Sequence, residues 1–424
     1  MKETVFTYAA PGLKFGADAS AEIGPDLARL GVGRVLIITD AGVRSTGHPD
    51  RIAAQVEAAG MACAVFDGSR VEPTDESIGE AVDWARTHGP WDAFVAVGGG
   101  SSIDTAKAVN LLTTNEGDLF DYLNPPIGAG RAPTHPLRPL VAVPTTTGTG
   151  SESTTICVLD VLSLHVKTGI SHPALRPTLA FVDPLLSISQ PAQVTAASGL
   201  DVLCHALESY TARTYTDFEK KAPEQRVPYC GANPIADLWC ERSMQLLSGA
   251  LRAAVRRGDD GLAREQMAMA ATFAGLGFGN AGVHIPHANA YPIAGRARDF
   301  HAPGYPGEGP LVPHGMAVSL TAPEAFRFTY AASPERHLRA AALLDPGHLH
   351  HHRDHGAEAL PAVVTALIHD VGMPNGLSAV GFVESDVPDL VVGASQQHRL
   401  LATAPRTPGA EDLESIFVGS FRLW

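Results

Sequence analysis

The sequence is short of cysteine, of positive charge and of long apolar runs, and each shortage excludes a class of protein. Its 424 residues include five cysteines that are widely scattered and form no CxxC pair, so we expect free thiols in a reducing compartment, not a disulfide framework. Lysine and arginine number 31 against 45 aspartates and glutamates, and a net charge of −14 would repel the phosphate backbone of nucleic acid. No apolar run approaches the roughly 20 residues that a membrane span requires.

The beginning of the chain also lacks the pattern of a targeting segment. Residues 1–16 have neither the basic-then-apolar layout of a signal peptide nor the Arg- and Ser-rich character of a transit peptide. With 45% apolar and 18% charged residues, the chain can fill well-packed cores and is not of disordered composition. We therefore expect a soluble, globular, cytoplasmic protein that binds neither nucleic acid nor membranes.

The first half of the sequence alternates between strand-like and helix-like segments. Short apolar runs predict four buried strands, at residues 34–39, 62–66, 93–97 and 140–143. Helical spacing of apolar residues appears between them, for example at residues 45–59 and 76–87. This alternation predicts an α/β domain, in which a parallel sheet is covered by helices on both faces.

The second half loses the strand signal after about residue 190 and becomes helical. Segments rich in Ala and Leu predict helices at residues 195–212, 234–257, 262–276 and 361–371. Asn233 and Pro234 form a good helix start, with an Asn cap and Pro at the first helical position. Because the chain is too long for one ordinary core, we predict an α/β domain at residues 1–190 and an all-helical domain at residues 191–424.

Three polar segments interrupt the predicted helices. Residues 213–231 and 297–310 contain charged residues, Gly and Pro, and we interpret them as inserted loops. The third segment holds five of the 18 histidines: His348, His350, His351, His352 and His355. A metal site is one interpretation of this cluster, but its polar surroundings favour a solvated surface loop.

A glycine-rich segment at the end of a predicted strand is typical of a phosphate-binding loop. Glycines let backbone N–H groups approach a pyrophosphate closely, and the N-terminus of a following helix favours its negative charge. The pattern is not GxGxxG, so the ordinary Rossmann fingerprint is absent and a tight turn is the alternative. The residues concerned are Gly98, Gly99, Gly100, Ser101 and Ser102, with Asp104 and Lys107 in the helix that follows.

Two further segments lie just past predicted strands, where the ligands of open parallel sheets bind. Asp40 ends the first strand, and a carboxylate there accepts the ribose hydroxyls of NAD while it repels the 2′-phosphate of NADP. Thr145, Thr146 and Thr149 follow the fourth strand and offer hydroxyls to a phosphate or a nicotinamide. Each segment alone is explained as a turn, but three such segments at the ends of three strands predict a dinucleotide site.

Acidic and histidine residues in the helical half predict a metal site. Asp201 and His205 are four residues apart in a helical segment, so both face one side of the helix, and Glu208 lies one turn further. On its own, this pair is more easily explained as an ordinary hydrogen-bonded pair. His287 and His314 each lie near Pro or Gly in an apolar stretch, where an unpaired imidazole is costly to bury. One carboxylate and three imidazoles suit a divalent transition metal with a position open for a substrate oxygen.

These motifs together resemble the iron-containing (group III) alcohol dehydrogenases over essentially the whole chain. The resemblance is carried by residues 98–104, 144–152, 199–208, 287 and 312–315. It implies an NAD-binding α/β domain followed by an all-helical metal domain, a fold shared with dehydroquinate synthase. It also implies that Asp201, His205, His287 and His314 hold the metal. Fe²⁺ is favoured through the family, although Zn²⁺ suits the same donors.

Within that family the chain is most similar to the hydroxyacid–oxoacid transhydrogenases. This similarity is carried by residues 165–170, 233–239, 273–284 and 334–338 and by the two inserted loops. It implies that 4-hydroxybutyrate and 2-oxoglutarate are converted to succinate semialdehyde and 2-hydroxyglutarate, with NAD held between the two half-reactions. The metal would polarise the alcohol or carbonyl oxygen as hydride moves to or from the nicotinamide. We also expect a homodimer or a larger homo-oligomer.

Residues for proton transfer and substrate binding are marked less clearly. Tyr291 stands where many family members have a second histidine, and a phenol with a reference pKa of about 10 is a poorer proton relay. His284 is a possible substitute, although a packed histidine is the simpler interpretation. Because both substrates are carboxylates, we expect a cation in the pocket, with Lys167 first and Arg296 and Arg298 next. A solvated lysine at a strand edge is the alternative for Lys167.

Three other functions are left open by the sequence. An NAD-dependent alcohol dehydrogenase or aldehyde reductase would carry the same motifs but release its cofactor at each turnover. A lyase or synthase on a similar scaffold would need further basic residues around the metal ligands, which the sequence lacks. A non-catalytic binding protein would have kept the metal and nucleotide motifs without use.

Overall fold

The structure is a computed structural model that describes residues 1–164, 166–305, 307, 309–348 and 354–424. The chain forms two compact units, one of residues Ala10–Gln190 and one that joins Met1–Ala9 to Pro191–Trp424. The first nine residues therefore pack with the helical unit, although the sequence-based division assigns them to the α/β domain. Glu3 anchors them, because its N–H donates to the carbonyl of Phe218 at 2.9 Å and its carboxylate pairs with Arg226 at 2.8 Å.

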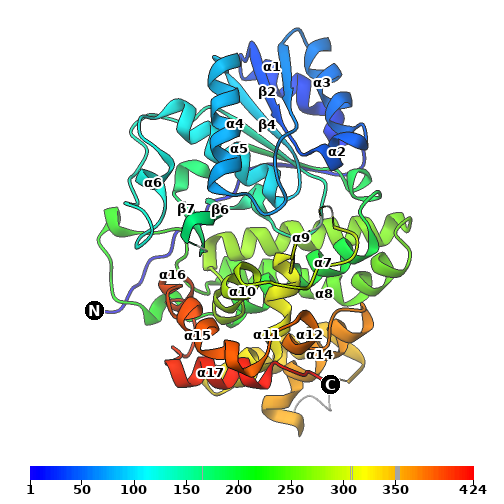
Figure 1. Ribbon diagram of the computed structural model, residues 1–424. Helices are drawn as coiled ribbons and strands as arrows, with labels where there is room; N and C mark the ends of the chain where they lie inside the picture. The colour runs from blue at the N-terminus through cyan, green and yellow to red at the C-terminus, as the bar shows by residue number, and fades with distance from the viewer. Residues whose placement is uncertain (165, 306, 308, 349–353) are drawn as a thin grey trace. The chain divides into compact units, whose positions relative to one another are not determined.

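A six-stranded, fully parallel sheet runs through the unit Ala10–Gln190 (Figure 1). Its strand order is β1-β8-β5-β4-β2-β3. The four predicted strands are present as β2 (Arg34–Ile38), β3 (Ala62–Phe66), β4 (Ala93–Gly98) and β5 (Leu140–Pro144). Two short strands that the sequence did not predict, β1 (Gly12–Phe15) and β8 (Leu179–Val182), extend the sheet beyond β5.

Helices cover both faces of this sheet, as the alternating pattern predicts (Figure 1). One face is covered by α4 (Asp75–His88) and α5 (Gly100–Thr114), and the other by α1 (Ile23–Arg29) and α3 (His48–Ala58). Adjacent residues of a strand therefore enter different cores, Val35 on the α1 side and Leu36 on the α4 side. This explains the near-continuous apolar runs, and the predicted α/β class is confirmed.

An antiparallel hairpin, β6 (Ile156–Val161) and β7 (Val166–Ser171), follows β5 and forms a sheet of its own. The sequence did not predict this hairpin, because polar residues interrupt its apolar pattern. Asp160 and Lys167 stand opposite each other in the ladder, where an apolar pair would have given a clearer strand signal.

The described residues of the second unit are built mainly from helices, which confirms the predicted helical class. The long helices α7 (Ala192–Thr211), α8 (Pro234–Arg256) and α9 (Gly261–Ala281) pack together. Asn233 caps α8 as expected, because its Oδ1 accepts the N–H of Ala236 at 3.0 Å. The remaining longer helices are α10 (Ile285–Gly295), α11 (His314–Thr329), α12 (Pro334–Leu344), α14 (Ala359–Asp370), α15 (Val387–Ser395) and α17 (Ala410–Gly419). Over the described ranges, no helix combines the length and the apolarity that crossing a membrane demands.

The two predicted inserted loops contain little regular structure. Residues 213–231 include only the short 3₁₀ turns η6 (Tyr215–Asp217) and η7 (Pro223–Gln225), and the described part of 297–310 contains no helix. Of the five clustered histidines, His350, His351 and His352 lie outside the described residues. The expected surface loop therefore stays a prediction.

Candidate functional site

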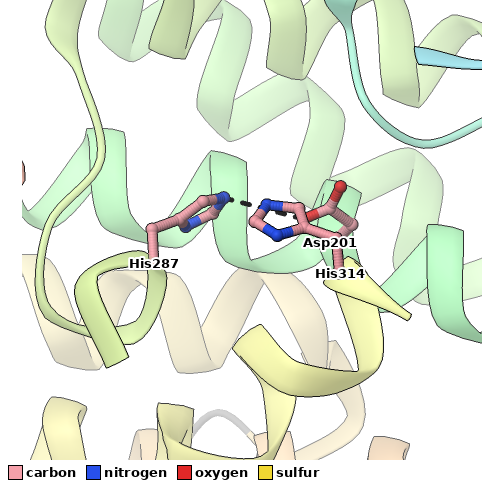
Figure 2. A group of neighbouring side chains, drawn as sticks. All are labelled: Asp201, His287 and His314. Carbon is pink, nitrogen blue, oxygen red and sulfur yellow. Dashed lines mark ion pairs between the residues drawn. The ribbon is translucent and has the colours of Figure 1, made fainter. Parts of the chain in front are cut away.

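Three side chains from three helices meet in the helical unit. Asp201 lies on α7, His287 on α10, and His314 is the first residue of α11. One ligand atom from each lies within 4.8 Å of the other two, and Figure 2 shows both imidazole rings beside the carboxylate. Asp201 and His287 are buried and His314 is half-buried. The fold thus brings together three of the four predicted metal ligands.

Small and rigid residues at the helix ends make this approach possible. A Cβ on Gly315 would lie 2.8 Å from the Cβ of Asp201, so glycine at this position lets α11 begin directly against α7. Pro286 lies in the first turn of α10, and Pro313 precedes α11. The fixed φ of proline suits both helix starts, which carry His287 and His314.

The carboxylate of Glu208 orients His287. Nδ1–H of His287 donates to Oε1 of Glu208 at 2.6 Å, and the backbone N–H of His284 donates to Oε2 at 2.5 Å. This bond leaves Nε2 of His287 facing Asp201, 3.6 Å from its Oδ1. Nε2 is buried and has no hydrogen-bond partner within the described residues. A nitrogen lone pair directed at a carboxylate fits a pair of ligands that share a cation.

Burial sets the protonation of these groups. It lowers the pKa of His287 to about 3, so the ring is neutral near pH 7, which is the form that binds metals. Burial also raises the pKa of Glu208 to about 7, while His284 and the backbone N–H donors oppose that rise. The donated hydrogen bonds therefore favour the ionised carboxylate that His287 needs.

His205, the fourth predicted ligand, lies beside the group but outside it. Its Nε2 is 3.7 Å from Oδ1 of Asp201, and its ring centroid is 4.6 Å from that of His287. The ring stacks on Phe278, with centroids 3.9 Å apart and planes 6° from parallel. Stacking, as well as the carboxylate, therefore holds this imidazole in place.

The donor set fits a divalent transition metal. A carboxylate and neutral imidazoles are ligands that both Fe²⁺ and Zn²⁺ accept. Among the described residues, no second group of three His, Cys, Asp or Glu side chains comes together in this way. The chemistry of the donors and the buried Nε2 of His287 both support a metal at this position.

The two residues considered for proton transfer have different surroundings. His284 is fully buried, its Nε2 lies 3.1 Å from Oγ1 of Thr211, and burial lowers its pKa to about 4. These contacts fit the packed histidine that is the simpler interpretation of His284. Tyr291 follows His287 by one turn of α10, and its ring centroid is 6.2 Å from that of His314. Tyr291 therefore borders the candidate metal site.

In the α/β unit, the glycine segment and the threonine segment lie against each other. A Cβ on Gly99 would lie 3.1 Å from Oγ1 of Thr146, and one on Gly100 would lie 2.7 Å from Cγ2 of Thr149. The second distance is shorter than real Cβ contacts, so a side chain on Gly100 would force Thr149 to shift. The N–H of Thr145 also donates to the carbonyl of residue 98 at 3.0 Å. The two segments thus form one surface at the carboxyl ends of β4 and β5.

Asp40 joins the same surface from the end of β2. Its Oδ1 accepts the N–H of Val43 at 2.9 Å and caps α2 (Ala41–Ser45), while its Oδ2 accepts the hydroxyl of Ser102 at 3.2 Å. The hydroxyl of Ser101 accepts the N–H of Glu72 at 3.2 Å. All three predicted strand-end segments are therefore adjacent, as a dinucleotide site requires.

Asp104 and Lys107, which were predicted to bind the cofactor, have structural contacts instead. Nζ of Lys107 is fully buried and donates to Oγ of Ser151 at 2.7 Å, to the carbonyl of Ile156 at 2.6 Å and to Oδ1 of Asp104 at 3.2 Å. Oδ2 of Asp104 accepts the N–H of Val158 at 2.9 Å. These bonds tie α5 to β6, so both charged groups are already used within the fold.

The cations predicted to bind a substrate carboxylate are paired within the protein. Nζ of the buried Lys167 donates to Oε2 of Glu72 at 2.6 Å and to Oδ2 of Asp160 at 2.8 Å, so two carboxylates outweigh its charge. Arg296 and Arg298 are exposed, and each pairs with an aspartate at the start of α15. A role in binding a substrate carboxylate does not fit these contacts, because the positive charges are already paired. The sequence does not reveal these ion pairs, since most of the partners lie far apart along it.

Two residues near these sites were not predicted. Glu72 links Ser101 to Lys167. Arg399, on α16 (His398–Leu401), lies close enough for its charge to help lower the pKa of His287, after the larger effect of burial. Neither residue belongs to a motif, and the sequence offers no specific signal for either.

The chain matches known protein families over most of its length. Residues 11–184 match the family described as iron-containing alcohol dehydrogenase, and residues 195–421 match the C-terminal family of Fe-containing alcohol dehydrogenases. A Bos taurus protein named mitochondrial hydroxyacid-oxoacid transhydrogenase is 42% identical over 422 residues, which cover 99% of this chain and 90% of that protein. A Dictyostelium discoideum protein named as a probable transhydrogenase of the same kind is 38% identical over 435 residues, covering 99% of this chain and 79% of that protein.

The names of these relatives contradict the expected cytoplasmic location, because both proteins are named as mitochondrial. Free cysteines indicate only a reducing compartment, and they do not distinguish one such compartment from another.

Solved structures show the same fold over nearly the full chain. The crystal structure of a 1,3-propanediol oxidoreductase has a TM-score of 0.85 and 32% identity, covering 99% of this chain and 100% of that one. A sulfoacetaldehyde reductase from Bifidobacterium kashiwanohense in complex with NAD+ has a TM-score of 0.81 and 26% identity, covering 98% of each chain. Together with the two family matches, these similarities show that the chain belongs to the iron-containing alcohol dehydrogenase family of oxidoreductases.

Proposed function

We propose that this oxidoreductase is a hydroxyacid–oxoacid transhydrogenase. It would oxidise 4-hydroxybutyrate to succinate semialdehyde and reduce 2-oxoglutarate to 2-hydroxyglutarate. The observation that carries the proposal is the full-length similarity to relatives of that name. The meeting of Asp201, His287 and His314 supports it, because those relatives' reaction needs a place for an alcohol or carbonyl oxygen.

Asp201, His287 and His314, with His205 beside them, are the residues that would hold the metal, and the family favours Fe²⁺. When bound, a divalent metal supplies Lewis-acid polarisation of the substrate oxygen, and NAD supplies the acceptor and donor of hydride. Glu208 keeps His287 in the tautomer whose Nε2 lone pair faces Asp201. Imidazoles bind metals in the neutral form, so the Asp201 carboxylate would be the charged donor that favours a cation.

Asp40, the glycines Gly98–Gly100 and the adjacent threonines are the residues that would hold NAD. The helix α5 begins at Gly100, so its first N–H groups are available to a pyrophosphate. The carboxylate of Asp40 accepts hydroxyl donors such as those of the ribose, as it already accepts the hydroxyl of Ser102. The same negative charge disfavours NADP.

Tyr291 is the residue we assign to exchange of the substrate's hydroxyl proton. It is buried on the face of α10 that carries His287, and its ring lies near that of His314. His284 is a weaker candidate, because its Nε2 already contacts the hydroxyl of Thr211. Tyr291→Phe would retain the ring and remove the hydroxyl.

A reaction without added cofactor tests the proposal. Metal-reconstituted protein is mixed with 4-hydroxybutyrate and 2-oxoglutarate, and both products are quantified. We expect succinate semialdehyde and 2-hydroxyglutarate in equal amounts, and neither product when 2-oxoglutarate is omitted. If turnover appears only when free NAD is supplied, the transhydrogenase proposal is wrong.

The second candidate is an NAD-dependent alcohol dehydrogenase that releases its cofactor at each turnover. The likeness to 1,3-propanediol oxidoreductase favours it. Dependence of the rate on free NAD, with saturation by a neutral alcohol, would identify this activity. A homo-oligomer also stays a prediction, and sedimentation of the purified protein would test it.

A further inference from the structure

Arg399, on a helix that packs against α10, has an incomplete set of hydrogen-bond partners. Its Nη1 is buried and has no hydrogen-bond partner in the part of the chain that the structure describes. Its guanidinium lies over the ring of Tyr229, 5.0 Å from the centroid. A buried guanidinium nitrogen without an acceptor is costly, so this position favours an anion.

A second arginine shows what the completed arrangement looks like. The guanidinium of Arg336 lies over the ring of Tyr210, 4.1 Å from the centroid, and its Nη2 donates to the carboxylate of Asp237 at 2.6 Å. Arg399 also lies over a tyrosine ring, that of Tyr229. Unlike Arg336, however, it has a guanidinium nitrogen, Nη1, for which no described residue provides an acceptor. A carboxylate would supply the acceptor that Nη1 of Arg399 lacks.

Packing brings Arg399 to the start of the metal-site helix. α16, which carries Arg399, packs against α10, which carries His287 (Figure 1). Tyr229 and Thr403 both lie against Gly282, where a Cβ would be 3.3 and 3.2 Å from their side chains. Gly282 has φ +94°, a left-handed conformation that also requires glycine.

Thr403 fixes the same junction with a hydrogen bond. Its hydroxyl donates to the carbonyl of Val283 at 2.5 Å, just before α10 begins. Thr403, four residues after Arg399, thus ties this segment to the start of α10.

We propose that Arg399 binds the carboxylate of the substrate, whose hydroxyl or oxo group lies at the site formed by Asp201, His287 and His314. The proposal rests on the proposed function and names its substrate class, a short hydroxy or oxo acid. A guanidinium holds a carboxylate through two parallel hydrogen bonds, which fixes the orientation of the acid. Arg399 replaces Lys167, Arg296 and Arg298 in the role that the sequence suggested for those cations.

The test compares acidic and neutral substrates in Arg399→Met, which keeps the length of the side chain and removes its charge. For each substrate, kcat/KM is measured with metal-loaded protein and saturating NAD. We expect the ratio of kcat/KM for 4-hydroxybutyrate to that for 1-butanol to fall by about 10- to 100-fold, mainly through a higher KM for the acid. Arg399→Lys should recover part of the loss.

Arg406→Met is the matched control. Arg406 also lies over an aromatic ring, that of Phe328 at 4.0 Å, but it is an exposed residue that pairs with Asp412. Its substitution should leave the substrate ratio within about twofold of the wild type. An unchanged ratio in Arg399→Met, or an equal loss for both substrates, would overturn the proposed carboxylate site.

Binding of 2-oxoglutarate, measured by calorimetry on metal-loaded protein, separates this proposal from the proposed function. If the wild type binds 2-oxoglutarate and Arg399→Met binds it at least tenfold more weakly, Arg399 is supported as the carboxylate site even if no transhydrogenase turnover is seen. Equal affinity in the two proteins, or no binding to the wild type, rejects the arginine as a carboxylate site even if turnover is present.

Discussion

The carboxylate of Glu208 lies 2.6 Å from Nδ1 of His287, and this one contact decides which ring nitrogen faces Asp201. A histidine whose Nδ1 is bonded to a carboxylate can offer only Nε2 to a metal. Because Glu208 is fully buried, water cannot take over this contact when the carboxylate is changed.

Glu208→Gln should weaken metal binding by about 10- to 100-fold, because a neutral amide holds the Nδ1–H tautomer less well. The measurement is the transfer of metal from the protein to a competing chelator near pH 7. Glu241→Gln is a suitable control, since Glu241 makes its contacts with Tyr210 and Arg339 away from the site. Equal metal retention in Glu208→Gln and the wild type would contradict the orienting role.

His205→Ala and His287→Ala together test how many residues bind the metal. His287→Ala should lose bound metal almost completely, because its Nε2 lies within the donor group. If His205 completes the set as the sequence predicts, His205→Ala should lose metal to a similar extent. Metal content per chain, measured by elemental analysis, decides between three ligands and four. Full metal content in His287→Ala would show that the metal does not bind at the proposed site.

Lys107→Met should lower the free energy of unfolding by about 3–5 kcal/mol, because it leaves the buried carboxylate of Asp104 without its cation. Urea unfolding followed by circular dichroism measures this change. Arg70→Met, which breaks the exposed pair with Glu80, should cost about 1 kcal/mol or less. Similar losses in the two variants would show that the buried contacts of Lys107 do not stabilise the fold more than an exposed ion pair does.

Glu152 gives the α/β unit a pH-dependent stability. Burial raises its pKa from 4.5 to about 7, so the folded chain holds a proton that the unfolded chain has lost. Stability from this group is therefore complete below about pH 4.5 and declines as the pH rises to about 7. In Glu152→Gln, this part of the decline should disappear, as judged from urea midpoints between pH 5 and pH 8. A slope unchanged from the wild type would show that Glu152 is ionised in the folded protein.

Family and fold could be predicted because their signals are local. The strands β2 to β5 are apolar runs buried on two faces, and the motifs around Asp201, His287 and His314 keep their spacing whatever the rest of the chain does. The family and the fold class are confirmed by the comparisons. Strand β1 could not be found in the same way, since it has only four residues and is partly exposed.

The role of a charged residue could not be predicted when its partner lies far away in the sequence. Lys107 and Lys167 stand in suggestive motifs, but each donates to groups that only folding brings near. Arg399 shows the opposite case, because no motif surrounds it and its Nη1 has no acceptor in the described structure. For these residues, a charged side chain in a motif is thus weaker evidence for ligand binding than a missing hydrogen-bond partner in the fold.

The pairing of Met1–Ala9 with the helical unit has a consequence for how the protein is made. These nine residues leave the ribosome before the α/β unit does, but their docking surface at Phe218 and Arg226 is synthesised only after the entire α/β unit has emerged. The leading segment must therefore wait, undocked, while the sheet folds behind it. A bulky N-terminal fusion would then disturb the last half of the protein to mature, while leaving the first half intact.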